Sequence, residues 1–216
     1  MPEETMEQTA RFFAESIHRK DDHLSVGFLG ISHLLPALTK CGQTALAFTL
    51  LEQKGNPGWL YSVINGATTI WERWNSYIAE TGTFGDVSMN SFNHYAYGSI
   101  GQWLYRTVLG IQTGTPKDEA GYHRIYLTPS WGGTLTFATG EQETPFGKIV
   151  SSWEKKNTMI SYRCTIPANT TASLILPAKS ETSVRVVEGS VSSQSFAAET
   201  SCFELTSGNY LFEIYE

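Results

Sequence analysis

The hydrophobic pattern of this chain changes period near residue 114, and this change limits the fold more than any other feature. Before that point apolar residues recur at spacings of three and four, the period of an amphipathic helix. After it apolar and polar residues alternate, the period of a strand in an antiparallel sheet. The sequence therefore predicts an α+β multidomain chain, with a helical domain over residues 1–113 and an antiparallel β-sandwich over residues 114–216.

Four segments of the first part have helical character. The first follows Pro2, because Met6, Ala10, Phe13 and Ile17 fall on one stripe of a helix. The other three helices are expected at residues 28–40, 44–54 and 91–109. The second should end at Gly42, a typical helix stop, and should pair with the third as a helical hairpin. Residues 55–90 contain many aromatic residues without helical period and are expected to form a long functional loop.

Eight strands are expected in the second part, separated by turn residues such as those at Lys155-Lys156-Asn157. They cover residues 122–127, 134–139, 148–154, 159–166, 171–176, 184–187, 202–205 and 210–214.

Charge and composition exclude several classes of partner. The chain has a formal net charge of −6 and a pI near 5.4, so it should repel nucleic acid and anionic membranes. The sequence contains no run of about 18 apolar residues, so no transmembrane helix is expected. The first twenty residues lack the features of a secretory signal, so a cytoplasmic location is expected by default.

The cysteines and histidines do not predict a metal or cofactor site. Cys41, Cys164 and Cys202 lack metal-ligand spacing, and reduced, buried thiols are the expected state. A bond between Cys164 and Cys202 stays open, since their strands could be neighbours. The histidines are scattered, and Asp21-Asp22-His23 is better explained as a solvated loop than as a cation site.

The segment GATTIWERWNSY, residues 66–77, places a carboxylate beside indole rings. Glu72 lies between Trp71 and Trp74. Sugar sites combine such rings, which pack on apolar C–H faces, with carboxylates, which accept hydroxyl protons. The alternative is that Glu72 and Arg73 form a surface ion pair while the tryptophans belong to the core.

The segment MNSFNHYAYGSIGQWLY, residues 89–105, contains further polar candidates. Asn93 and His94 lie at the expected start of a helix, where unpaired N–H groups and polar side chains can bind sugar hydroxyls. Alternatively, Asn90 or Ser91 is a simple helix cap and His94 a hydrogen-bonded core histidine.

Four segments resemble, in order, the C-terminal end of bacterial α-L-rhamnosidases of glycoside hydrolase family 78. They are DDHLSVGFLGISHLLPAL (21–38), GATTIWERWNSY (66–77), MNSFNHYAYGSIGQWLYR (89–106) and ETPFGKIVSSWE (143–154). The resemblance implies the closing helices of a six-hairpin (α/α)6 barrel, followed by the C-terminal β-sandwich of the family.

The resemblance also implies roles for individual residues. It makes Glu72 the general base in an inverting hydrolysis of terminal α-L-rhamnose, and makes His94 a sugar ligand. Trp71, Trp74 and Asn93 would complete the pocket. An inverting glycosidase needs a second carboxyl group roughly 6.5–9.5 Å from the first. The general acid of the family lies in an upstream motif that no part of this chain resembles.

The chain is therefore expected to be an incomplete enzyme, inactive alone, that acts on L-rhamnose-containing glycosides or polysaccharides. The missing N-terminal half of the enzyme is a candidate partner, because an open set of barrel helices should expose apolar faces. Two other functions stay open: a non-catalytic carbohydrate-binding module and a split-gene remnant. Calorimetry with L-rhamnose would test the first, and an upstream reading frame with the acidic motif would indicate the second.

Overall fold

A computed structural model describes residues 3–114 and 120–215. It divides into two compact units, which are described separately. The helical unit comprises Met1–Trp103 with Gly132–Thr134, and the sandwich unit comprises Leu104–Trp131 with Leu135–Glu216. The helical unit ends at Trp103, whereas the pattern of the sequence changes about ten residues later.

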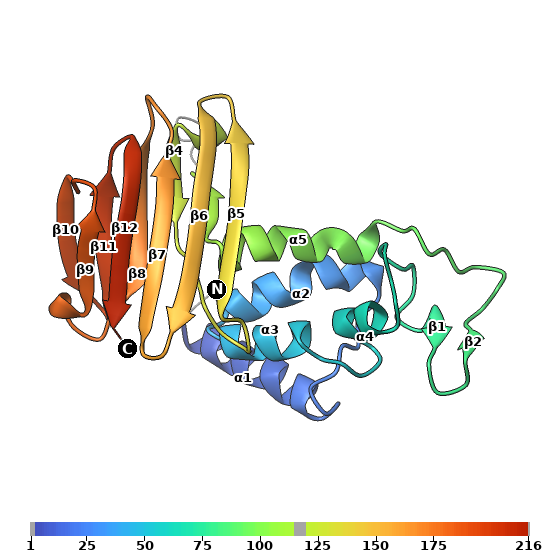
Figure 1. Cartoon of the computed structure of the whole chain (residues 1–216). Coiled ribbons are helices and arrows are strands. Elements are labelled where there is room, and N and C mark those ends of the chain that lie inside the picture. Colours follow the sequence, from blue (N-terminus) through green and yellow to red (C-terminus); the bar gives the residue numbers. More distant parts are fainter. Residues whose placement is uncertain (1–2, 115–119, 216) are drawn as a thin grey trace. The chain divides into compact units, whose positions relative to one another are not determined.

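The helical unit contains the expected helices and one that was not expected (Figure 1). They are α1 (Glu3–His18), α2 (Phe28–Lys40), α3 (Thr44–Leu51), α4 (Trp59–Ile64) and α5 (Ile100–Trp103), the last preceded by the 3-10 turn η1 (Ala96–Ser99). Helix α2 has the predicted bounds, whereas α3 ends at Leu51, three residues before its predicted end. It ends in a Schellman motif in which Gly42 has φ +73° and the Gln43 N–H donates to the Leu38 carbonyl at 2.8 Å.

Helix α2 continues through Pro36, although proline usually interrupts a helix. Pro36 lies on the exposed side of α2. On that side the carbonyl that loses its helical partner can turn toward water, which limits the cost of the interruption.

The core of the helical unit is formed by α2, α3 and α5. Leu35, Leu38 and Leu50 are fully buried. The Trp103 ring packs edge-on against Phe48 at 5.1 Å, and its Nε1 donates to the Thr39 hydroxyl at 2.9 Å. The predicted hairpin of α2 and α3 is therefore confirmed, and the Trp103 side chain contacts both of its helices.

Residues 132–134 belong to the helical unit because Glu52 holds them. The Glu52 carboxylate accepts the Thr134 N–H at 2.8 and 3.0 Å and the Thr134 hydroxyl at 3.0 Å. A side chain on Gly132 would begin only 2.6 Å from the Phe48 ring, so the close approach requires glycine.

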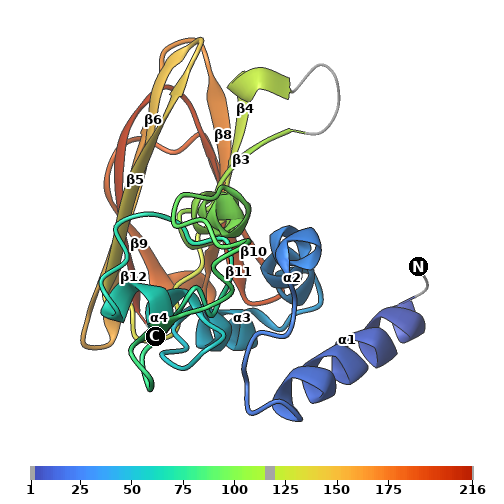
Figure 2. The same ribbon diagram turned by 90° about the vertical axis from the view of Figure 1, so that its right-hand side faces the viewer.

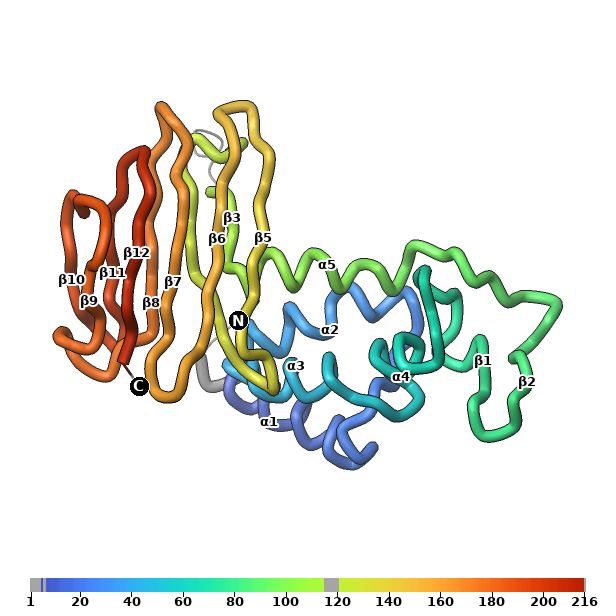
Figure 3. Tube along the Cα trace, viewed as in Figure 1, coloured from blue at the N-terminus to red at the C-terminus, as the bar shows by residue number. Residues whose placement is uncertain are grey.

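Residues 55–90 are more ordered than predicted. They contain α4 and a two-stranded hairpin, β1 (Tyr77–Ile78) and β2 (Thr83–Phe84), both labelled in Figure 3. Both elements are too short for their periodicity to be read from the sequence. Many large apolar side chains of the helical unit stay exposed, namely Phe28, Leu29, Val63, Ile64, Val87, Met89 and Tyr95.

The prediction of a helix over residues 91–109 is wrong in its first turn. Residues 91–95 are not helical, and the helical run begins at Ala96. The His94 N–H donates to the Ile70 carbonyl at 2.8 Å instead of serving a helix. Tertiary hydrogen bonds thus replace the expected N-terminal turn. The run closes in the sandwich unit with the π-helix η2 (Leu104–Val108).

The sandwich unit has two five-stranded sheets, which face each other in Figure 2. One sheet has the order β10 (Ser193–Ala197), β11 (Thr200–Leu205), β8 (Thr171–Pro177), β4 (Arg124–Leu127) and β3 (Ile111–Thr113). The other has the order β5 (Phe137–Thr144), β6 (Gly147–Lys156), β7 (Met159–Ile166), β12 (Gly208–Tyr215) and β9 (Val184–Glu188). Short 3-10 turns lie at η3 (Ala120–Tyr122) and η4 (Glu181–Ser183).

Each of the eight predicted strands overlaps an observed strand, which confirms the sandwich, although β5 begins at Phe137 and not at residue 134 and continues to Thr144. Strands β3 and β10 were not predicted, because β3 is short and every residue of β10 is exposed, so no apolar alternation marks it. The pairing is antiparallel except between β4 and β8, which run parallel. The predicted hairpin turn between β6 and β7 is present, but it consists of Asn157 and Thr158, with Asn157 at φ +57°. Lys155 and Lys156, which were predicted to lie in the turn, pair with β7 as part of β6.

The three cysteines are free. Cys164 on β7 and Cys202 on β11 lie in different sheets, so the open alternative of a bond between them is wrong. Burial raises the pKa of the Cys164 thiol far above its ordinary value, which keeps it protonated and unreactive. Among the residues that the structure describes, none lies in a helix that is both long and apolar enough to cross a membrane.

Candidate functional site

Two loop segments of the helical unit, residues 69–72 and 91–94, lie side by side. The Glu72 N–H donates to the Ser91 carbonyl at 2.8 Å, and the His94 N–H donates to the Ile70 carbonyl at 2.8 Å. A side-chain bond adds to these, because the Thr69 hydroxyl donates to the Phe92 carbonyl. These hydrogen bonds join the two motifs that the sequence identified separately.

The Glu72 carboxylate is held by the same pairing. Its side chain is half-buried, and Oε2 accepts the Ser91 N–H at 2.7 Å. A charge-assisted bond of this length fixes one oxygen of the carboxylate and leaves the other available to a substrate or water. Arg73 does not pair with Glu72 as the alternative required; its guanidinium lies 4.0 Å from Asp86.

Trp74 stands in a stack of rings next to this carboxylate. Its indole lies parallel to the Tyr97 ring at 3.7 Å and meets Trp59 edge-on at 5.3 Å. Its Nε1 donates to the Val26 carbonyl at 2.9 Å. Burial raises the pKa of Tyr97; the charge of Arg73 opposes this rise and the charge of Glu72 adds to it. Glu72 therefore acts electrostatically on a ring that the sequence did not single out.

His94 is half-buried and lies between two other rings. It is 5.7 Å from Phe28 and stacks on Tyr95 at 5.1 Å. Its Nδ1 lies 3.3 Å from the Ala96 N–H and accepts it, which places the proton of a neutral ring on Nε2. His94 is thus neither a helix-start residue nor a fully buried core histidine, and its Nε2–H is a candidate donor to a sugar hydroxyl.

Trp71 and Asn93 are placed differently from Glu72 and Trp74. Trp71 is buried and packs edge-on against Phe92 at 5.4 Å. It lines a cavity of about 670 Å³ that does not include Glu72. The Asn93 side chain is exposed. The two tryptophans therefore contact different ring clusters, and the phenyl and phenol rings of Phe28 and Tyr97 complete the cluster around Trp74.

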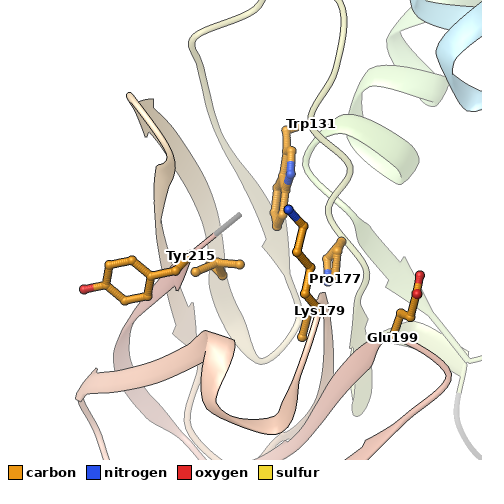
Figure 4. A pocket seen from close by; sticks show the side chains of 7 residues that line it. Trp131, Pro177, Lys179, Glu199 and Tyr215 are labelled. Carbon is orange, nitrogen blue, oxygen red and sulfur yellow. The ribbon is translucent and has the colours of Figure 1, made fainter.

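The sandwich unit has a smaller cavity, of about 170 Å³ (Figure 4). Trp131, Pro177 and Lys179 gather on one side of it, while the Tyr215 ring points away. The Tyr215 hydroxyl donates to the Glu213 carboxylate at 2.7 Å and is not directed at a ligand. No group of three or more His, Cys, Asp or Glu residues in the described ranges could hold a metal ion.

Two family models match the chain. The bacterial alpha-L-rhamnosidase 6 hairpin glycosidase domain matches residues 1–108, and the bacterial alpha-L-rhamnosidase C-terminal domain matches residues 110–191. The first match ends where the π-helix η2 ends, and the second begins one residue before β3.

Proteins named Alpha-L-rhamnosidase are similar to most of the chain. The Streptomyces avermitilis protein is 40% identical over 200 residues, which are 92% of this chain and 18% of that protein. A Formosa agariphila protein is 41% identical over 186 residues, which are 86% of this chain and 20% of that protein. The chain thus spans about a fifth of the length of these curated relatives.

Solved structures agree with the sequences. The Streptomyces avermitilis α-L-rhamnosidase complexed with L-rhamnose superposes with a TM-score of 0.89 at 36% identity, covering 99% of this chain and 20% of that one. The Aspergillus terreus enzyme superposes with a TM-score of 0.84 at 28% identity, covering 99% of this chain and 22% of that one. The chain therefore belongs to the bacterial α-L-rhamnosidase family, as a part of the six-hairpin glycosidase domain joined to the C-terminal domain.

Proposed function

We propose that this chain supplies one wall of the active site of an inverting α-L-rhamnosidase, in which Glu72 is the general base. The observation that carries the proposal is the fixed carboxylate: Glu72 Oε2 is anchored by the Ser91 N–H at 2.7 Å, in a segment that also carries His94. The substrate would be a terminal α-L-rhamnose unit of a glycoside or polysaccharide.

The base would act on a water molecule. A carboxylate with one anchored oxygen keeps the second oxygen free to take a proton from water as it attacks the anomeric carbon. The Nε2–H of His94 would bind a ring hydroxyl, and the stacked rings of Trp74 and Tyr97 would support that wall of the pocket. Asn93, which is exposed, would contact the sugar at the rim of the pocket. Trp71, which is buried, would support the segment that carries Glu72.

The reaction also needs a protonated carboxyl group on the opposite side of the sugar. Asp86, the carboxylate nearest to Arg73, does not meet this need. Hydrogen bonds from the Ser88 hydroxyl and N–H lower its pKa, so it is ionised at neutral pH and cannot donate a proton efficiently. We therefore assign the general acid to an upstream part of the six-hairpin domain, the candidate partner of this chain.

The test compares two proteins: this chain alone, and a longer polypeptide that carries the complete six-hairpin domain. An aryl α-L-rhamnoside should be hydrolysed only by the longer protein, with β-L-rhamnose as the first product by NMR. Glu72→Gln in that protein should lower kcat about 100-fold or more, because the amide keeps the bond to Ser91 but cannot take a proton. Glu80→Gln, at an exposed residue of the β1–β2 turn, is the matched control. Turnover by the short chain, or near-normal kcat for Glu72→Gln, would refute the assignment.

The two rival functions give other results. A carbohydrate-binding module would bind L-rhamnose saturably and would show no hydrolysis in either protein. A split-gene remnant would show neither binding nor hydrolysis until the upstream part was restored.

A further inference from the structure

The cavity behind Trp71 has walls built from four aromatic rings. Trp71 meets Phe92 at 5.4 Å and 82°, and Phe92 meets Phe84 at 5.7 Å and 83°. Phe84 meets Tyr77 across the β1–β2 hairpin at 5.8 Å and 58°. In these edge-to-face contacts the edge of one ring covers one face of its neighbour, and the rest of the ring surface is left uncovered by that contact. Phe84 and Phe92 are 61% and 37% exposed and offer their accessible surface to the cavity, whereas Trp71 is buried.

The remaining wall is the segment 64–69 that follows α4. It combines backbone with small polar side chains, and Thr68 is exposed. Gly66 has φ +86°, and a side chain there would meet nothing within 4 Å, so this stretch of backbone is open to a ligand. Asn65 is held in place by a bond from its Nδ2 to the Tyr61 carbonyl at 2.8 Å. Backbone groups and hydroxyls thus border the aromatic walls.

The ligand class follows from what lines the cavity. None of the lining residues carries a charge, which disfavours phosphates, carboxylates and amines. A purely apolar ligand would leave the polar border without partners. A neutral pyranose ring has an apolar C–H face for the rings and a border of hydroxyls for the polar groups. The volume of about 670 Å³ falls within the range of small-molecule pockets.

We propose that this cavity, lined by Trp71, Tyr77, Phe84 and Phe92, is a second sugar-binding subsite, distinct from the Glu72 carboxylate. It takes a neutral pyranose unit of the substrate other than the rhamnose that is cleaved. The ligand class rests on the proposed function, since a rhamnosidase acts on chains or glycosides that contain further rings. Trp71 adjoins Glu72 and Phe92 adjoins Ser91, so the subsite shares its backbone with the proposed catalytic wall.

The test is saturation-transfer NMR of this chain with methyl α-L-rhamnoside and with a rhamnose disaccharide as probes. The method observes the ligand and tolerates self-association of the protein. Phe84→Ala should weaken disaccharide binding about fivefold or more, because it removes one ring wall. Phe84 is 61% exposed, so its removal should leave the core intact. The control is Phe137→Ala, whose ring is 64% exposed on the sandwich unit and should leave binding unchanged.

Glu72→Gln separates this proposal from the proposed function. Disaccharide binding that survives Glu72→Gln and His94→Ala but weakens in Phe84→Ala supports the subsite, whether or not the longer protein hydrolyses rhamnosides. Binding that is unaffected by Phe84→Ala, or absent in the unmodified chain, overturns the subsite and leaves the Glu72 assignment intact.

Discussion

Ser151 offers the sharpest test of how the sandwich core is held together. It is fully buried on β6. Its hydroxyl donates to the Leu109 carbonyl at 2.6 Å, and since its one proton is used there, it accepts the Tyr162 O–H at 3.0 Å. Tyr162 is also fully buried, which raises its pKa far above the ordinary value and keeps the hydroxyl a donor.

The expected free energies follow from which groups each substitution leaves unpaired. Ser151→Ala leaves two buried groups, the Leu109 carbonyl and the Tyr162 hydroxyl, at roughly 1–3 kcal/mol each, or about 2–6 kcal/mol together. Tyr162→Phe removes one hydrogen bond but leaves the bond from Ser151 to Leu109, and should cost about 0.5–1.5 kcal/mol. The double variant leaves only the carbonyl unpaired, so it should be more stable than Ser151→Ala.

The free energy of unfolding of the sandwich would be measured by urea denaturation, with near-UV circular dichroism and hydrogen exchange of β6 and β7 amides as probes. Ser152→Ala is the matched control, because Ser152 is the next residue of β6 and is only half-buried. It should change stability by no more than about 0.5 kcal/mol.

The change in stability on adding Tyr162→Phe to Ser151→Ala tests the assigned direction of the two hydrogen bonds. If adding Tyr162→Phe to Ser151→Ala lowers stability further, the Tyr162 hydroxyl is not left unpaired by the loss of Ser151. The inferred direction of the two hydrogen bonds would then be wrong.

Two further predictions concern acid stability and association. Hydrogen bonds from Tyr215 and Arg185 hold the pKa of Glu213 below its ordinary 4.5. The stabilisation from these bonds is therefore present above pH 4.5 and is lost as pH falls through the lower folded-state pKa. Glu213→Gln should flatten the acid limb of a plot of sandwich stability against pH, and an unchanged slope would contradict the role. Leu29 and Val87 are 89% and 88% exposed, and this chain should self-associate through such side chains. Sedimentation velocity should show smaller species for Leu29→Ser with Val87→Ser, whereas a monomeric unsubstituted chain would count against the expectation.

Local periodicity was enough to determine many elements of this protein. The bounds of α2 and β7 were predicted from the sequence as they stand in the structure. Each element buries one face, so apolar residues recur with the helical period in α2 and at alternate positions in β7. Residues 91–95 were wrongly predicted to be helical as an extension of the helical segment that follows them, because their backbone instead forms hydrogen bonds to a segment about twenty residues earlier in the chain. Propensity contains no information about such a partner.

The candidate site was also predicted only in part from the sequence. The types and spacing of Glu72, Trp71, Trp74 and His94 could be read from the sequence and marked the chemistry of a sugar site. Their assignment to two separate ring clusters could not, because the side chains were distributed by the pairing of residues 69–72 with 91–94. The sequence by itself determined which residues were available, and the tertiary structure decided which of them share a surface, since that depends on contacts between segments distant in the chain.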